Sequence, residues 1–132
     1  MDDQVDSEYF ERYKRHILIR NIGGQGQRNI VQAKVLVVGL GGIGSTVLQH
    51  LAALGIGKIG LVDRDNVELS NLQRQTIYTY EDIGKNKVSV ASNFVKKLNK
   101  NVSTTEYNLF LDKNNSTNII SEYDLVLDGT DN

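Results

Sequence analysis

The sequence has 132 residues, of which 39% are hydrophobic and 23% charged, and its formal net charge is −1 at pH 7. A chain of this length can form one domain with a core and is too short for two. The balanced charge argues against a nucleic-acid partner. The absence of cysteine excludes disulfides and thiolate chemistry within these residues. No apolar run approaches the roughly 20 residues of a membrane span, and the N-terminus lacks the basic and apolar regions of a leader, so we expect a cytoplasmic protein without a membrane partner.

Helices and strands alternate along the chain. We expect helices at residues 7–20, 27–32, 45–54, 85–98 and 113–121, and strands at residues 34–38, 58–63, 102–109 and 124–128. Ser7 can cap the first helix, residues 23–26 form a glycine-rich loop, Gly55 ends the third helix, and Asp82 can cap a short turn before Lys85. The alternation predicts a Rossmann-like α/β fold, with a mostly parallel sheet and helices on both faces.

Two regions follow from this pattern. Residues 1–33 are expected to be an N-terminal helical segment, and residues 34–132 a Rossmann-like nucleotide-binding domain. The chain stops four residues after the last expected strand, where a helix should return across the sheet. We therefore expect the domain to be incomplete at its C-terminus.

A glycine fingerprint stands between the first strand and the helix that follows it. Gly39 permits a tight turn, Gly41 a close backbone approach to phosphate, and Gly44 close packing of helix and strand. Phosphate would then meet the free N–H groups at the start of the helix. Asp63, 19 residues beyond Gly44 at the end of the second strand, can accept hydrogen bonds from ribose hydroxyls. These residues predict a nucleotide site, although glycines can also serve packing alone, and the motif permits NAD or FAD as well as ATP.

The segment after the second strand is too long and too polar for an ordinary connection. Asp65, Asn71, Arg74 and Gln75 lie in it, and Lys87 stands near the start of the next helix. A triphosphate that is cleaved needs cations where negative charge develops, whereas the diphosphate of NAD needs few. We predict that these residues converge on a phosphorylated ligand; the alternative is a solvated loop and a surface lysine.

Two aspartates follow the last strand. A carboxylate at Asp131 would face the same crevice and could hold Mg²⁺ against phosphates, or it could simply favour a turn. Asp128 is expected to belong to the end of the strand and its hydrogen bonding.

These motifs together resemble the MoeB/ThiF family, relatives of the ubiquitin-activating enzymes. The matching segments are residues 12–16, 26–27, 35–45, 63–75, 82–87 and 124–132. The run Asn71-Leu-Gln-Arg-Gln75 and the terminal Asp-Gly-Thr-Asp-Asn are far more specific to that family than the glycine loop.

The resemblance implies adenylation of the C-terminal glycine of a β-grasp, ubiquitin-like sulfur-carrier protein, for molybdenum cofactor or thiamin biosynthesis. ATP and Mg²⁺ are bound, and the carrier's carboxylate attacks the α-phosphorus, which yields an acyl-adenylate and pyrophosphate. The roles that the resemblance implies are nucleotide contact for Gly41 and Gly42, ribose binding for Asp63, phosphate contact for Asn71, Arg74 and Lys87, and Mg²⁺ ligation for Asp131. Arg15 matches an arginine that reaches the neighbouring subunit's site, which implies a homodimer.

Members of this family carry a second half with the carrier-binding surface and commonly a four-cysteine zinc site. Zinc is therefore expected only in such a C-terminal half. Three alternatives stay open: adenylation of another carboxylate, on a tRNA base or a peptide; an NAD-dependent oxidoreductase, which would not need Arg74, Lys87 or Asp131; and a non-catalytic nucleotide-binding module.

Overall fold

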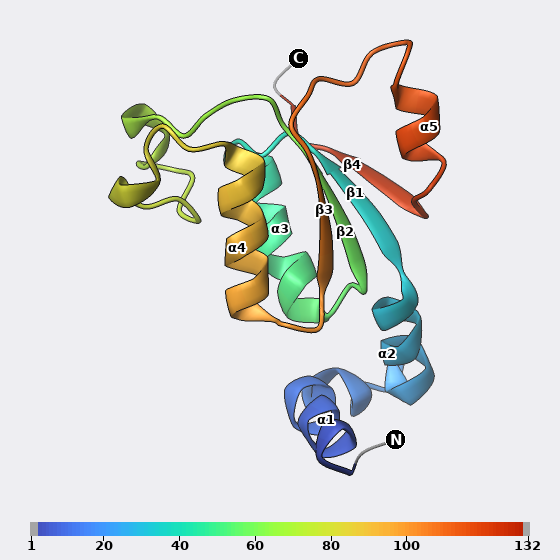
Figure 1. The fold of residues 1–132 in the computed structure, drawn as a ribbon. Coiled ribbons are helices and arrows are strands. Elements are labelled where there is room, and N and C mark those ends of the chain that lie inside the picture. The colour runs from blue at the N-terminus through green and yellow to red at the C-terminus, as the bar shows by residue number, and fades with distance from the viewer. Residues whose placement is uncertain (1–2, 131–132) are drawn as a thin grey trace.

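A single parallel sheet organises the molecule (Figure 1). The computed structural model describes residues 3–130. Its four strands are β1 (Lys34–Val38), β2 (Lys58–Val62), β3 (Ser103–Tyr107) and β4 (Leu125–Asp128), in the spatial order β3-β2-β1-β4. All three pairings are parallel. The predicted α/β class is thus confirmed, and the order reverses between β1 and β4, which is where such sheets bind ligands.

The two faces of the sheet are covered differently. Helices α3 (Gly42–Leu54) and α4 (Lys87–Leu98) cover one face, and α5 (Ser116–Ile120) lies on the other side, in the connection back to β4 (Figure 1). The core between the sheet and α3 and α4 is mostly aliphatic; its members include Val35, Val37, Leu48, Ile59, Leu61, Ala91 and Val95. Because side chains alternate along a strand, Leu36 and Gly60 point to the opposite face, where the Tyr123 side chain lies directly over Gly60.

The helices α1 (Asp3–Ile17) and α2 (Gly23–Gln32) lie at the amino ends of the strands (Figure 1). Buried polar contacts attach them to α3 and to the C-terminal end of α4. The Asn99 side chain donates to the Tyr13 hydroxyl at 2.9 Å and to the Ala52 carbonyl at 3.0 Å. Gln27, which is fully buried, donates to the Leu54 carbonyl at 3.0 Å, and its oxygen lies 3.0 Å from a His16 ring nitrogen.

Several predicted boundaries were wrong at the N-terminus. Helix α1 already spans Asp3, so Ser7 lies inside it and is not its cap; no glycine or proline precedes Ser7 to stop it. The expected loop at 23–26 is the first turn of α2, in which Gly26 donates to Ile22 O at 2.8 Å. The buried contacts of α2 outweigh the poor helix propensity of glycine. The other elements match within three residues, and Gly55 ends α3 at φ 92° as expected.

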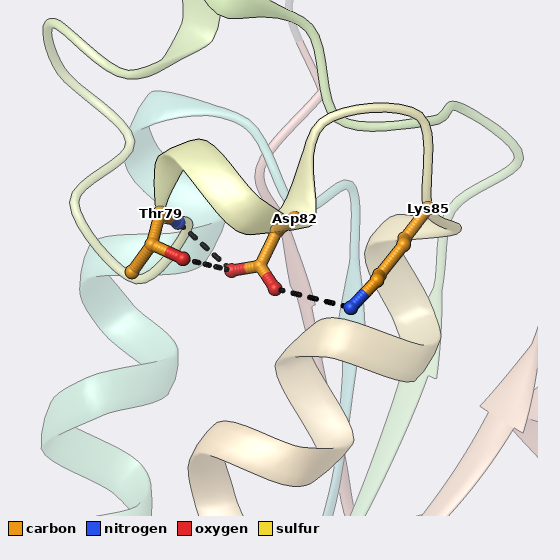
Figure 2. A network of polar contacts seen from close by, with 3 residues as sticks. All are labelled: Thr79, Asp82 and Lys85. Carbon is orange, nitrogen blue, oxygen red and sulfur yellow. Dashed lines mark hydrogen bonds and ion pairs between the residues drawn. The ribbon is translucent and has the colours of Figure 1, made fainter.

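The connection from β2 to α4 is compact despite its polarity. It contains two short 3-10 turns, η1 (Leu69–Asn71) and η2 (Tyr80–Asp82). Figure 2 shows the contacts that close the second: the backbone N–H and hydroxyl of Thr79 donate to one Asp82 oxygen at 2.8 and 3.0 Å, and Lys85 lies 4.0 Å from the other. The expected turn before Lys85 is therefore present. Within residues 3–130, no helix is long and apolar enough to cross a membrane.

Candidate nucleotide-binding site

A cleft of about 710 Å³ opens at the carboxyl ends of the strands. Residues after all four strands line it, because parallel strands end at the same edge of the sheet. The lining residues that the sequence analysis predicted are Gly39, Gly41, Asp63, Asp65, Asn71, Arg74, Gln75 and Lys87. The structure thus brings together side chains from a loop, a strand end and the first turn of a helix.

Four predicted residues stand apart from this lining. Gly42 is next to it, since a Cβ placed there would lie 3.8 Å from Arg74 Cδ. Gly44 is buried behind the loop. Arg15 is exposed on α1, and α1 lies at the amino ends of the strands (Figure 1), away from the carboxyl ends where the cleft opens. Asp131 lies outside the described residues.

The glycine loop is packed tightly against the end of β4. Gly39 has φ 88°, a conformation that side chains disfavour. A Cβ on Gly44 would collide with the carbonyl oxygen of Gly39, and a Cβ on Gly129 would lie 2.9 Å from Gly44 Cα. The turn that opens the cleft therefore depends on three glycines from two distant segments, and Gly129 was not predicted.

Asp63 connects the loop to the second strand. Only 9% of Asp63 is exposed, and its two oxygens accept hydrogen bonds from the Leu40 N–H at 2.8 Å and the Asp65 N–H at 2.7 Å. A carboxylate offers about four acceptor positions, so both oxygens can still accept bonds from a ligand. In contrast, the Asn71 oxygen already accepts from the Glu68 N–H at 2.8 Å, which leaves the Asn71 amino group as the donor it can offer.

Two cations border the loop. Lys87 is only 5% exposed, yet no described carboxylate lies within 4.0 Å of its ammonium group. A buried charge without a counter-ion is costly, and an anion in the cleft would offset that cost. Arg74 is exposed and lies along the loop, with its Nε 3.9 Å from where a Cβ on Gly42 would be.

Gln75 presents an unsatisfied buried acceptor. The residue is 2% exposed, and its side-chain oxygen has no hydrogen-bond partner among the described residues. Buried polar atoms are almost always paired in folded proteins. Because Gln75 lines the cleft, a ligand donor such as a hydroxyl or amino group could complete this bond.

One side of the cleft is an apolar wall that was not predicted from the sequence. Leu109, Phe110 and Leu111, which follow β3, line the cleft, and the Arg64 guanidinium lies 5.2 Å from the centre of the Phe110 ring. This wall makes one side of the cleft suitable for a flat, apolar group such as a purine base. The rule that residues just past a strand end line the crevice, applied to β3, would have found it.

Asp128 was assigned to the strand end and does end β4, but it also lines the cleft. Hydrogen bonds from the hydroxyl and the backbone N–H of Thr130 lower the pKa of Asp128 below its ordinary value. Within residues 3–130, no cluster of three or more acidic or histidine side chains could hold a metal by itself. One or two carboxylates are enough for Mg²⁺ when phosphates complete its coordination, and Asp65 and Asp128 both line the cleft.

Comparison with known proteins identifies the family. The sequence profile described as the ThiF family matches residues 13–132, and the chain belongs to that family. It is 43% identical over 125 residues to a sulfur carrier protein adenylyltransferase from Thermus thermophilus, covering 95% of this chain and 46% of the relative. It is 40% identical over 128 residues to a SAMP-activating enzyme E1 from Haloferax volcanii, covering 97% and 47%. The predicted resemblance is confirmed, and the chain spans less than half the length of these two relatives.

A solved structure agrees with the sequence relatives. The crystal structure of the E. coli tRNA N6-threonylcarbamoyladenosine dehydratase in complex with ATP matches with a TM-score of 0.88 and 28% identity, over 95% of this chain and 51% of that one. The fold that this chain adopts is therefore one that holds ATP in a related protein.

Proposed function

We propose that this chain is the ATP-binding part of an enzyme that adenylates the C-terminal glycine of a ubiquitin-like sulfur-carrier protein, for molybdenum cofactor or thiamin biosynthesis. The observation that carries the proposal is Lys87, a buried cation without a described counter-ion at the edge of a cleft that also contains Arg74 and the glycine loop. The relative named as a sulfur carrier protein adenylyltransferase supports the choice of acceptor.

The cleft suggests an orientation for ATP. The adenine would pack against the apolar wall after β3, and the ribose hydroxyls would donate to Asp63. The phosphates would then extend along the glycine loop toward Arg74 and Lys87, within reach of the Asn71 amino group. Each part of the nucleotide would meet a surface of matching chemistry. The adenine end would lie on the apolar side of the cleft and the phosphate end on its cationic side.

In the proposed reaction, a carboxylate oxygen of the carrier forms a bond to the α-phosphorus of ATP. The bond from that phosphorus to the oxygen that bridges the α- and β-phosphates breaks. Pyrophosphate leaves with the electron pair. Such transfers are catalysed mainly by alignment and by neutralisation of charge. The planar Arg74 fork and the compact Lys87 ammonium would supply that charge from two directions. Mg²⁺, held by Asp131 and the phosphates, would neutralise further charge on the leaving group.

We also propose a homodimer. Arg15 is exposed on α1, which lies at the amino ends of the strands (Figure 1), whereas the cleft opens at their carboxyl ends. In this proposed dimer, Arg15 serves the site of a second subunit. Within each subunit, we propose that residues 1–33 form a helical segment and residues 34–132 the nucleotide-binding domain.

A second candidate is adenylation of another carboxylate by the same cleft. The TM-score with the E. coli enzyme favours it. That enzyme shares the fold, and its name refers to a tRNA nucleoside and not to a carrier protein. The two candidates predict the same ATP site and differ only in the acceptor.

The first experiment is calorimetric titration of the chain with ATP and Mg²⁺, and separately with NAD. We expect binding of ATP alone, weakened at least about tenfold in Arg74→Ala because a charge-assisted contact is lost. Binding of NAD alone would replace this proposal with a dehydrogenase. ATP-pyrophosphate exchange by a protein that also carries the second half, measured with a sulfur-carrier protein and with an RNA acceptor, then separates the two adenylation candidates.

A further inference from the structure

Tyr78 lies behind the cleft and contacts two of its components with different atoms. The side chain is buried, and its hydroxyl donates to the Leu40 carbonyl at 2.8 Å. The Lys87 ammonium lies 5.8 Å from the centre of the same ring. Leu40 belongs to the glycine loop and Lys87 to the first turn of α4, so one side chain joins two parts of the site that are far apart in the sequence.

The hydroxyl completes the attachment of the loop. The Leu40 N–H donates to Asp63 at 2.8 Å, while its carbonyl accepts from Tyr78. Both ends of this residue's backbone are therefore held by buried side chains. Burial, and secondarily the negative charge of Asp63, raise the pKa of Tyr78 above its ordinary value, so the hydroxyl keeps its proton and remains a donor at neutral pH.

The face of the Tyr78 ring attracts the Lys87 ammonium group. A lysine side chain has several rotatable bonds and reaches many positions unless something restrains its head group. The negative face of an aromatic ring attracts a cation at this distance, and no described carboxylate competes for it.

The backbone around Tyr78 is held as well. Its N–H donates to the Gln75 carbonyl at 3.3 Å, and the Thr79–Asp82 contacts follow at once in the chain (Figure 2). The Lys87 N–H donates to Asp65 O at 3.1 Å, which fixes the start of α4. The backbone of both Tyr78 and Lys87 is therefore fixed by hydrogen bonds.

We propose that Tyr78 is a positioning residue that holds the Lys87 ammonium and the glycine loop in a fixed relation, so that one phosphate group meets both. This inference rests on the proposed ATP site and extends it to a residue that is not expected to touch the nucleotide. Its two contacts can be removed separately: Tyr78→Phe removes the hydroxyl and keeps the ring, and Tyr78→Leu removes both.

The contact itself can be tested without a ligand. In NMR spectra of isotope-labelled lysine, assigned through Lys87→Arg, the ring should move the Lys87 side-chain signal upfield in the wild type and in Tyr78→Phe. In Tyr78→Leu the signal should return to the position of an exposed lysine. An unshifted Lys87 signal in the wild type would overturn the proposal.

The function of the contact is tested with ATP and with adenosine, which lacks phosphates. We expect Tyr78→Leu to weaken ATP binding by roughly tenfold and Tyr78→Phe by roughly fivefold, with adenosine affinity nearly unchanged in both. Tyr80→Leu is the matched control, because Tyr80 is 76% exposed in the same segment, and it should change neither affinity.

The outcomes separate the two proposals. Equal losses for ATP and adenosine would make Tyr78 an ordinary core residue and overturn its positioning role while ATP binding stands. A wild-type chain that binds no ATP would overturn the proposed function and this inference together. Selective loss of ATP binding in Tyr78→Leu, with the control unchanged, supports both.

Discussion

Replacement of Lys87 by methionine should stabilise the fold and weaken ATP binding. Methionine keeps most of the length and volume of the lysine side chain and removes the charge. Lys87 is 5% exposed and has no described ion pair, so its charge carries a desolvation cost, which is reduced because the ammonium group still borders the cleft. The contact with Tyr78 offsets about 1 kcal/mol of this cost.

The net expectation for Lys87→Met is a gain of about 1 kcal/mol in unfolding free energy, or a Tm higher by about 3 °C for a domain of this size. ATP binding should weaken by roughly 10- to 100-fold, because a hydrogen bond to a charged group is lost. Excess ATP that raises the stability of the wild type by about 2.7 kcal/mol at 100 times Kd should raise that of the variant by only about 0.4 to 1.4 kcal/mol.

Urea unfolding with and without ATP and Mg²⁺ measures both effects in one assay. Lys85→Met is the control, since Lys85 is 62% exposed and its only described ion pair spans 4.0 Å; its stability should change by less than about 1 kcal/mol. A Lys87→Met chain that is less stable than the wild type and binds ATP equally well would refute the reasoning, because Lys87 would then be a structural lysine.

Three further predictions follow from the geometry. Gly44→Ala should lower the unfolding free energy by at least about 3 kcal/mol, measured in urea, because its Cβ would collide with the Gly39 carbonyl; wild-type stability would contradict this packing. In a protein that also carries the second half, mixing inactive Arg15→Ala and Arg74→Ala variants should restore part of the proposed adenylation activity if Arg15 serves the partner's site, and no recovery would count against the dimer. The pKa of Asp128 is lowered from 3.8 in the folded state. The free energy of unfolding gained from Asp128 relative to Asp128→Asn should therefore be complete well above pH 3.8 and disappear as the pH falls through the pKa of the folded state. A difference in stability that persists in acid would show that it does not come from the charge of Asp128.

The sequence by itself determined the order of elements and the edge of the sheet where the site lies. Alternating strands and helices allow little besides a parallel sheet, and parallel strands end at one edge, so Gly39, Asp63 and Lys87 had to lie near each other. These conclusions depend on local periodicity and on chain direction, both of which can be read along the sequence. The family resemblance added expected roles, which the geometry makes testable.

Only the tertiary structure decided which side chains are buried and what they contact. The Tyr78 hydroxyl reaches a carbonyl 38 residues away, and no local pattern marks that pair. The same holds for Gly129 against Gly44, and for the burial of Gln27, which turns a glycine-rich segment into helix. Such contacts depend on how distant elements pack, and packing outweighs local propensity wherever a buried polar group must find a partner.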